Sequence, residues 1–160
     1  MIRRLLLLFA AGLLALTACS SDDGNQDETE RDEEGAVTEG GEVGAFAIQE
    51  GDCVQKPDGE TIADFEVVPC TEAHDLQTFA VFDLPDGDWP GDTALEESSN
   101  SGCLERWTDA IGTVYDEDQE HGVFVVKPTE DTWTRADDRE VLCMVGNVDE
   151  SQLTGSILQS

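Results

Sequence analysis

The sequence predicts an α+β domain in which a small antiparallel sheet carries one main helix on a face and two disulfides join the elements. Segments rich in Val and Phe, each bounded by Gly, Pro or Asp, recur after residue 60. One stretch, residues 93–114, has apolar residues at intervals of three or four, which indicates a helix. The sequence does not show the alternation of strands and helices that is typical of parallel βαβ units. An antiparallel sheet covered by the helix is therefore expected.

Four segments predict strands of this sheet, because β-favouring residues dominate them. They are DFEVVPC (64–70), LQTFAVFDL (76–84), GVFVVKP (122–128) and REVLCMVGNV (139–148). In the last segment Val141, Cys143 and Val145 occupy alternate positions and define one face of the strand. Residues 84–92 predict an irregular loop, and residues 153–160 predict either a last strand or a segment over the sheet edge.

Thr93 and Glu96 match the S/T-x-x-E capping box, so the helix is expected to begin there. Its apolar stripe consists of Leu95, Ser99, Cys103, Trp107, Ile111 and Val114. The stripe predicts that Trp107 is a core residue. Trp89 and Trp133 fall in predicted loops, where they serve either as buried anchors or as an exposed ligand-stacking surface.

Four cysteines follow Cys19, and an even number in a small exported domain favours disulfides. Four cysteines allow three pairings, and spacing alone does not select one. Cys103 lies on the apolar stripe of the helix, and Cys143 lies on the strand face that suits packing against it. We therefore pair Cys103 with Cys143, which leaves Cys53 with Cys70.

A zinc site is the competing interpretation of these cysteines. Cys70 and His74 have C-x₃-H spacing, and Cys53 or Cys143 would complete the ligand set. The sequence lacks the paired Cys-x₂₋₄-Cys motifs of structural zinc sites, and an oxidising compartment favours disulfides. We therefore expect no metal and no cofactor.

The first residues have the pattern of an export signal. Two arginines precede residues 5–16, an apolar run shorter than the roughly 20 residues that a membrane span needs. Residues 16–19, LTAC, resemble the bacterial lipobox, in which the cysteine receives diacylglycerol before cleavage. We expect residues 1–18 to be a lipoprotein signal peptide and Cys19 to anchor the chain on the extracytoplasmic face of the cell membrane. An ordinary secretory signal with a chance cysteine is the alternative.

Charge and composition divide the remaining chain. Removing residues 1–18 takes away two of eight basic residues and none of 37 acidic ones, so the mature charge is 6 − 37 = −31. This charge argues against nucleic acid as a partner. Residues 19–45 are acidic and poor in large apolar side chains, so we expect a disordered tether. The folded domain is then residues 46–160.

Two features of the sequence are candidates for a catalytic or cation-binding site. His74 and Asp75 place an imidazole next to a carboxylate, but no G-x-S-x-G motif supplies a nucleophile. A turn histidine that hydrogen-bonds the local backbone is the simpler interpretation; a metal-dependent or His-Asp hydrolase is the alternative.

The acidic run 116–122 is similar to a calcium loop but has His121 and Lys127 where an EF-hand needs Gly and Glu. An acidic cation-binding surface is the third interpretation.

The order of motifs along the domain supports a family resemblance. The motifs are GDCV (51–54), VPCTEAHDLQTFAVFDLPDGDWPGD (68–92), CL in the helix (103–104), PTEDTWTRADDREVLCMV (128–145) and LTGSI (153–157). The most specific are Cys70 before His74-Asp75, and Trp133 before Asp138-Arg139, Val141 and Cys143. Together they resemble the septum formation domain of actinobacterial envelope proteins. Ala73 and Asp137 depart from this pattern, which commonly has proline and glycine there.

The resemblance implies an exported or membrane-attached module with two disulfides and a link to cell division. It implies no catalytic residues, so His74, Asp75, Asp138 and Arg139 are the first candidates for a binding site. We therefore expect a lipid-anchored, non-enzymatic binding or scaffold module of the cell envelope. Its expected partners are the membrane, through Cys19, and envelope or division proteins.

Overall fold

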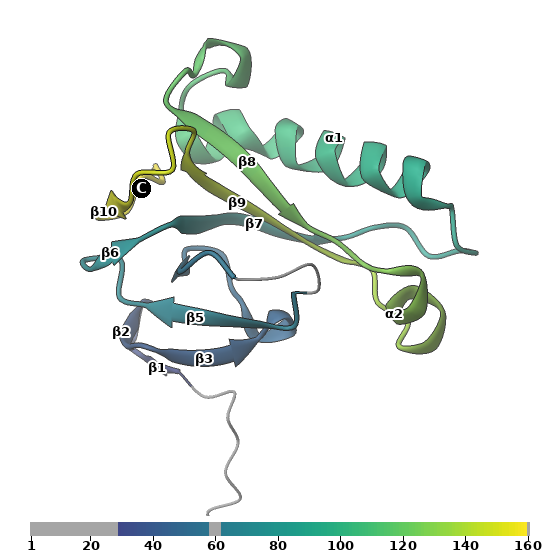
Figure 1. Cartoon of the computed structure of the whole chain (residues 1–160), viewed down its shortest axis with the longest axis horizontal. Helices are drawn as coiled ribbons and strands as arrows, with labels where there is room; N and C mark the ends of the chain where they lie inside the picture. Colours follow the sequence, from purple (N-terminus) through teal and green to yellow (C-terminus); the bar gives the residue numbers. More distant parts are fainter. Residues whose placement is uncertain (1–28, 58–61, 160) are drawn as a thin grey trace, which may run out of the picture.

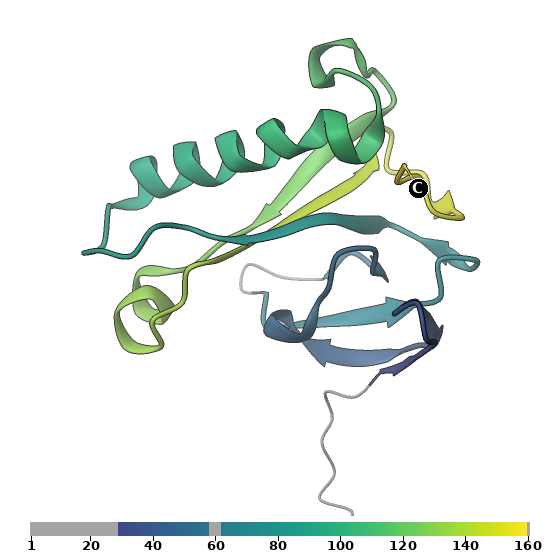
Figure 2. The same cartoon turned by 180° about the vertical axis from the view of Figure 1, so that it is seen from behind.

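The computed structural model of the chain describes residues 29–57 and 62–159. Its main sheet has six strands in the order β3-β5-β4-β7-β9-β8, and every neighbouring pair is antiparallel. These strands are β3 (Gly41–Gly44), β5 (Asp64–Val68), β4 (Cys53–Val54), β7 (Leu76–Asp83), β9 (Glu140–Asn147) and β8 (His121–Val126). Figures 1 and 2 show α1 (Asp92–Ile111) on one side of β7 and β9, with β3 and β5 on the other side. The predicted α+β class is confirmed.

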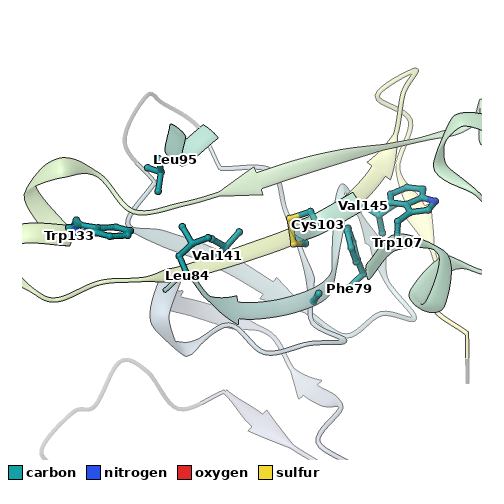
Figure 3. Close-up of a cluster of buried hydrophobic side chains, with 10 residues drawn as sticks. Phe79, Leu84, Leu95, Cys103, Trp107, Trp133, Val141 and Val145 are labelled. Atoms are coloured by element: carbon teal, nitrogen blue, oxygen red, sulfur yellow. A yellow bond between two sulfur atoms is a disulfide. The ribbon is translucent and has the colours of Figure 1, made fainter. Parts of the chain in front are cut away.

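The two faces of the curled sheet bury two hydrophobic cores. Strand β9 serves both, because successive side chains of a strand point to opposite faces. Val141, Cys143 and Val145 belong to the core under α1, whereas Leu142 and Met144 belong to the second core. Figure 3 shows Val141 and Val145 among the side chains of the core under α1. The second core otherwise comprises Val37, Val43, Ile48, Val54, Phe65, Val67 and Leu76. A strand buried on both faces needs apolar residues at every position, which explains the continuous run in β9.

Helix α1 begins at a different residue from the one predicted. Its N-cap is Gly91, with φ 87° and no side-chain cap, so Thr93 lies inside the first turn and the predicted capping box is wrong. Gly112, with φ 85°, ends the helix by donating its N–H to Thr108 O at 2.8 Å. Val114 therefore lies beyond the helix and is exposed. The rest of the predicted stripe faces the core: Leu95, Ser99, Cys103 and Trp107 are buried, and Ile111 packs at the margin.

A second helix, α2 (Glu130–Arg135), occupies a segment predicted as a loop. Thr129 caps it: its hydroxyl accepts the Thr132 N–H at 3.1 Å, and the Thr132 hydroxyl accepts the Thr129 N–H at 2.9 Å. Six residues are too few for apolar periodicity to be visible in the sequence. Trp133, on this helix, is buried beside Trp89, with ring centroids 5.7 Å apart, so these two tryptophans pack together as anchors.

The N-terminal boundary of the domain lies earlier than predicted. Residues 30–44 were expected in a tether, but they form β1 (Glu30–Arg31), β2 (Val37–Glu39) and β3, and they bury Val37 and Val43. Arg31 forms a bidentate ion pair with the buried carboxylate of Asp52. The hydrogen bonds that Arg31 donates to Asp52 raise the pKa of Arg31. The predicted signal peptide, Cys19 and the first part of the tether lie outside the described residues.

The remaining elements complete the molecule. Strand β10 (Leu153–Thr154) pairs with β6 (Ala73–His74) in a separate two-stranded sheet, and Ile157 and Leu158 then pack against the core under α1. Short 3₁₀ helices, η1 (Ala45–Ala47) and η2 (Tyr115–Glu117), join neighbouring elements. Within residues 29–57 and 62–159, no helix combines the length and the apolar character that crossing a membrane requires.

Candidate functional site

His74 occupies a structural position. Its side chain is fully buried in β6, and Nδ1 lies 2.9 Å from the carbonyl oxygen of Glu72. The other ring nitrogen, Nε2, is also buried and has no hydrogen-bond partner among the described residues. A general base must reach a substrate proton, and a ring enclosed on all sides does not present a nitrogen for that purpose.

The carboxylate of Asp75 accepts hydrogen bonds from two other segments of the chain. Its Oδ2 accepts the backbone N–H of Lys56 at 2.9 Å, and its Oδ1 accepts from the amide of Gln152 at 3.2 Å. These bonds connect the start of β7 to the segments after β4 and before β10. The adjacent pair in the sequence is therefore not a hydrogen-bonded pair in the structure.

The second candidate pair lies at a structural junction. The Arg139 guanidinium stacks on the Trp133 ring, 3.8 Å from its centroid, and donates to the carbonyl oxygens of Trp133 and Gly87 at 3.1 and 3.4 Å. Trp133 Nε1–H donates to the same Gly87 carbonyl at 3.0 Å. Asp138 Oδ1 accepts the Glu140 N–H at 3.0 Å and fixes the start of β9. Arg139 thus holds α2, the loop before α1 and β9 together.

The two candidate pairs do not form one site. His74 and Asp75 precede β7, whereas Asp138 and Arg139 precede β9 at the far end of β7, where Glu140 pairs with Asp83. The eight residues of β7 span roughly 26 Å at about 3.3 Å per residue. A small ligand cannot contact both pairs.

The cysteines form the two predicted disulfides, Cys53–Cys70 and Cys103–Cys143. The zinc interpretation is therefore wrong, because all of its thiols are consumed. The described residues also contain no cluster of three or more His, Cys, Asp or Glu side chains arranged to hold a metal.

The acidic run 116–122 folds as a turn around Asp118. The Asp118 carboxylate accepts the backbone N–H groups of Glu120 and His121 at 2.9 and 3.0 Å, and His121 Nδ1 lies 3.0 Å from its second oxygen. Burial alone raises the pKa of Asp118, but the hydrogen bonds from His121 and Glu120 outweigh it and leave the pKa below its ordinary value. The oxygens of Asp118 are thus occupied by local donors.

The outer edge of β8 offers backbone groups for recognition. Val148 N–H donates to Glu120 O at 2.9 Å, so these two residues form a hydrogen-bonded pair. In an antiparallel ladder such pairs recur at every second residue, so this bond determines which residues of β8 direct their backbone groups toward β9. The N–H and C=O groups of Val123 and Val125 consequently point away from β9. Strand β8 ends the order of strands in the main sheet, so within residues 29–57 and 62–159 no strand pairs with it on that side (Figure 1). We call these groups the β8 edge.

A pocket of about 610 Å³ adjoins the β8 edge on the sheet face opposite α1. Gly122 and Gly146 pair across β8 and β9 in its lining. At Gly146 a side chain would meet Asp75 O at 2.7 Å, whereas at Gly122 the nearest atom is Val148 Cγ1 at 3.3 Å. The other lining residues are Lys56, Pro57, Asp75, Leu76, Val123, Phe124, Asn147, Val148, Glu150 and Ser151. We call this the glycine pocket.

A family model described as septum formation matches residues 50–159. The chain belongs to the septum formation family. The matched region contains both disulfides, α1, α2, the β8 edge and the glycine pocket, and the resemblance stated from the motifs is confirmed. No curated protein and no solved structure matches the chain.

The sequence analysis identified the β8 segment as a strand but did not identify it as an edge strand of the sheet. The order of strands depends on long-range pairing with β9, which local composition does not encode. The glycine pocket was missed for the same reason, because distant segments line it. A glycine inside each of two strands, Gly122 and Gly146, was the available signal, since strand glycines often mark close approach of a backbone or ligand.

Proposed function

We propose that this chain is a non-enzymatic binding module of the cell envelope that acts in septum formation. The observation that carries the proposal is the β8 edge beside the glycine pocket, on a frame with two disulfides. His74 and Asp75, the residues that an enzyme would use, are instead engaged in structural hydrogen bonds. Membership of the septum formation family supports the connection with division.

The proposal includes a lipid anchor at Cys19 on the extracytoplasmic face of the membrane. The LTAC motif after a short apolar run supports it, and two disulfides are typical of an oxidising exterior. Anchoring restricts the module to the membrane surface, where even a weak interaction is favoured by a high local concentration of partners.

Cell fractionation tests the anchor. The unaltered chain is expected in the membrane fraction and should incorporate radiolabelled palmitate, whereas Cys19→Ser should lose the label and leave that fraction. Asp149→Asn, a change on an exposed turn outside the lipobox, is the control and should behave as the unaltered chain. Membrane retention of Cys19→Ser without label would refute lipidation.

Photo-cross-linking in dividing cells tests the binding role. A photoreactive residue at exposed Val148, beside the glycine pocket, is expected to capture a discrete envelope protein, and the captured species should be enriched at division sites. Phe46, which is 66% exposed in η1, is the matched control position. Equal capture at both positions, or an even distribution of the chain around the cell during division, would contradict the proposal.

A further inference from the structure

We propose that the β8 edge binds an extended segment of a partner protein by antiparallel strand addition, and that this segment alternates Lys or Arg with apolar residues. The inference rests on the proposed binding function and names the partner chemistry for that surface. It follows from the backbone of β8, the two surfaces beside it and the charge of the chain.

Strand β8 lacks the features that normally protect a sheet edge. Proteins block such edges with charged side chains, proline, bulges or a covering segment. Residues 122–126 read GVFVV, and the pairing of β8 with β9 is regular, without a bulge. Lys127 and Pro128 follow only after the strand. The N–H and C=O groups of Val123 and Val125 have no backbone partner among the described residues, so an added strand would satisfy them.

The surface on the α1 side of the edge includes the apolar side chains of Val123, Val125 and Leu104. The side chains of Val123 and Val125 face the core under α1 and are half-buried. Glu96 on α1 pairs with Lys127 at the end of β8, and Leu104 lies on the same helix ridge, eight residues further on. Leu104 is 42% exposed. Side chains of an added strand that point toward α1 would therefore meet these three apolar side chains.

The surface on the opposite side is acidic. Asp75 and Glu150 line the glycine pocket, and Lys56, 3.3 Å from Glu150, is the only basic residue among its lining. The acidic run 116–120 precedes β8. Alternate side chains of an added strand would point into this pocket, where a basic group gains electrostatic attraction. The two surfaces together specify a segment that alternates basic and apolar residues.

Net charge distinguishes a foreign segment from a second copy of this chain. Each copy without residues 1–18 carries a formal charge of 6 − 37 = −31, and strands in one sheet lie about 4.8 Å apart, within the roughly 8 Å screening length of physiological salt. Two copies joined at β8 would repel each other, whereas a basic segment is attracted. The charge therefore favours a basic partner over self-association.

The test uses the lipid-anchored chain in detergent micelles and the synthetic peptide KVKVKVKV. In the proposed geometry the valine amides face β8, because directly opposed residues of an antiparallel pair project their side chains to the same face. The peptide is expected to shift the amide signals of Val123 and Val125 and to slow their hydrogen exchange. N-methylation of alternate valines should abolish binding, whereas N-methylation of alternate lysines should preserve it. The peptide EVEVEVEV should bind at least about tenfold more weakly.

Variants of the chain test the same geometry. Val125→Pro removes an N–H that faces the open edge, a position where proline is tolerated, and should abolish binding. Glu150→Lys, at a side chain that is 81% exposed, is expected to weaken binding without altering the fold. Glu66→Lys, an equal change of charge at an exposed position on β5, should leave binding unchanged and is the matched control.

Equal binding of both N-methylated peptides would overturn strand addition, and equal binding of the lysine and glutamate peptides would overturn the charge assignment. Absence of any peptide binding, or a dimer that Val125→Pro dissociates, would refute the basic partner at this edge. Septal enrichment and cross-linking in cells are measured independently. If they persist while the peptide test fails, this inference falls and the proposed function stands.

Discussion

The turn before β9 requires a left-handed backbone conformation at Asp137. It has φ 57°, a left-handed conformation, in the connection from α2 to β9. The preceding turn closes tightly, because Thr132 O accepts the N–H groups of both Ala136 and Asp138. Glycine adopts this conformation without steric cost, which accounts for the glycine expected at this position from the resemblance to the family pattern. Aspartate retains the turn and adds an exposed ion pair with Arg139 at 3.0 Å.

The backbone strain at Asp137 is measurable by comparing two variants. Asp137→Gly and Asp137→Ala both remove the ion pair with Arg139, but only glycine relieves the left-handed conformation. Asp137→Gly is therefore expected to be more stable than Asp137→Ala by about 1 kcal/mol in urea unfolding. Equal stabilities would show that the turn relaxes when the side chain is removed.

Glu140 places an unfavourable charge at the start of β9. Partial burial, and then the charges of Asp138 and Asp83, raise the pKa of Glu140. Asp83 lies directly opposite it across the strands. A raised pKa in the folded state means that ionised Glu140 costs stability: the cost is absent below the unfolded pKa of about 4.3 and develops fully as pH rises through the folded pKa.

Glu140→Gln should consequently stabilise the protein at pH 7, by less than about 1 kcal/mol because solvent screens the repulsion. The difference from the unaltered chain should vanish near pH 3. Thermal melts across this range measure the effect, with Glu105→Gln on the exposed surface of α1 as control. A stabilisation that is the same at pH 3 and pH 7 would show that charge is not its cause.

At the scale of elements, α1 approaches β7 through a single small residue. Gly102 is buried, and a Cβ added there would lie 2.3 Å from the Phe82 ring. The Arg106 guanidinium stacks on the same ring, 4.0 Å from its centroid. The close contact between helix and strand therefore depends on the absence of a side chain at residue 102.

Gly102→Ala tests this contact against helix propensity. Alanine favours a helix over glycine by about 1 kcal/mol, but the clash with Phe82 should outweigh that gain and destabilise the protein by about 1–3 kcal/mol. Ser101→Ala, on the exposed side of α1, should change stability by less than about 0.5 kcal/mol. Combining Gly102→Ala with Phe82→Leu is expected to restore part of the loss; an unchanged loss would place the strain elsewhere.

The elements that the sequence predicted are those with local signals. Strands β5, β7, β8 and β9 are dense in β-favouring residues, and α1 has a long apolar stripe, so their types and the pairing of Cys103 with Cys143 followed. Residues 30–44 look like a tether because their composition is acidic and glycine-rich. They form strands through long-range pairing: β3 pairs with β5, and Arg31 reaches Asp52. A composition argument does not include such contacts.

The candidate site required the whole molecule. His74-Asp75 and Asp138-Arg139 stand out in the sequence as polar pairs, but each proves to be a local junction of the fold. The β8 edge and the glycine pocket contain mostly apolar residues and glycines, which carry no chemical signature in a sequence. Their significance comes from the strand order, the exposed backbone and the net charge, all of which are properties of the assembled chain.

At the scale of the whole molecule, the two disulfides hold different parts of the fold. Cys103–Cys143 joins α1 to β9 across 40 residues of sequence, and Cys53–Cys70 joins β4 to the turn after β5 across 17. Constraint of the unfolded chain contributes roughly 4 and 3 kcal/mol respectively. Cys103 and Cys143 are both fully buried, whereas in the other bridge Cys53 is fully buried and Cys70 only partly, so alanine replacements remove more core packing at Cys103–Cys143.

The double variant Cys103→Ala/Cys143→Ala should therefore lose more stability than Cys53→Ala/Cys70→Ala, by about 1 kcal/mol or more in urea unfolding. Hydrogen exchange should localise the difference: amides of α1 should lose protection in the first variant and retain it in the second, because Cys103–Cys143 is the disulfide that joins α1 to the sheet. Adding reductant to each variant breaks the disulfide that remains. The further loss of stability measures the contribution of that disulfide and serves as the internal control. Equal losses, or a larger loss from the Cys53–Cys70 variant, would show that the anchoring of β4 and β6, rather than that of α1, limits the stability of the domain.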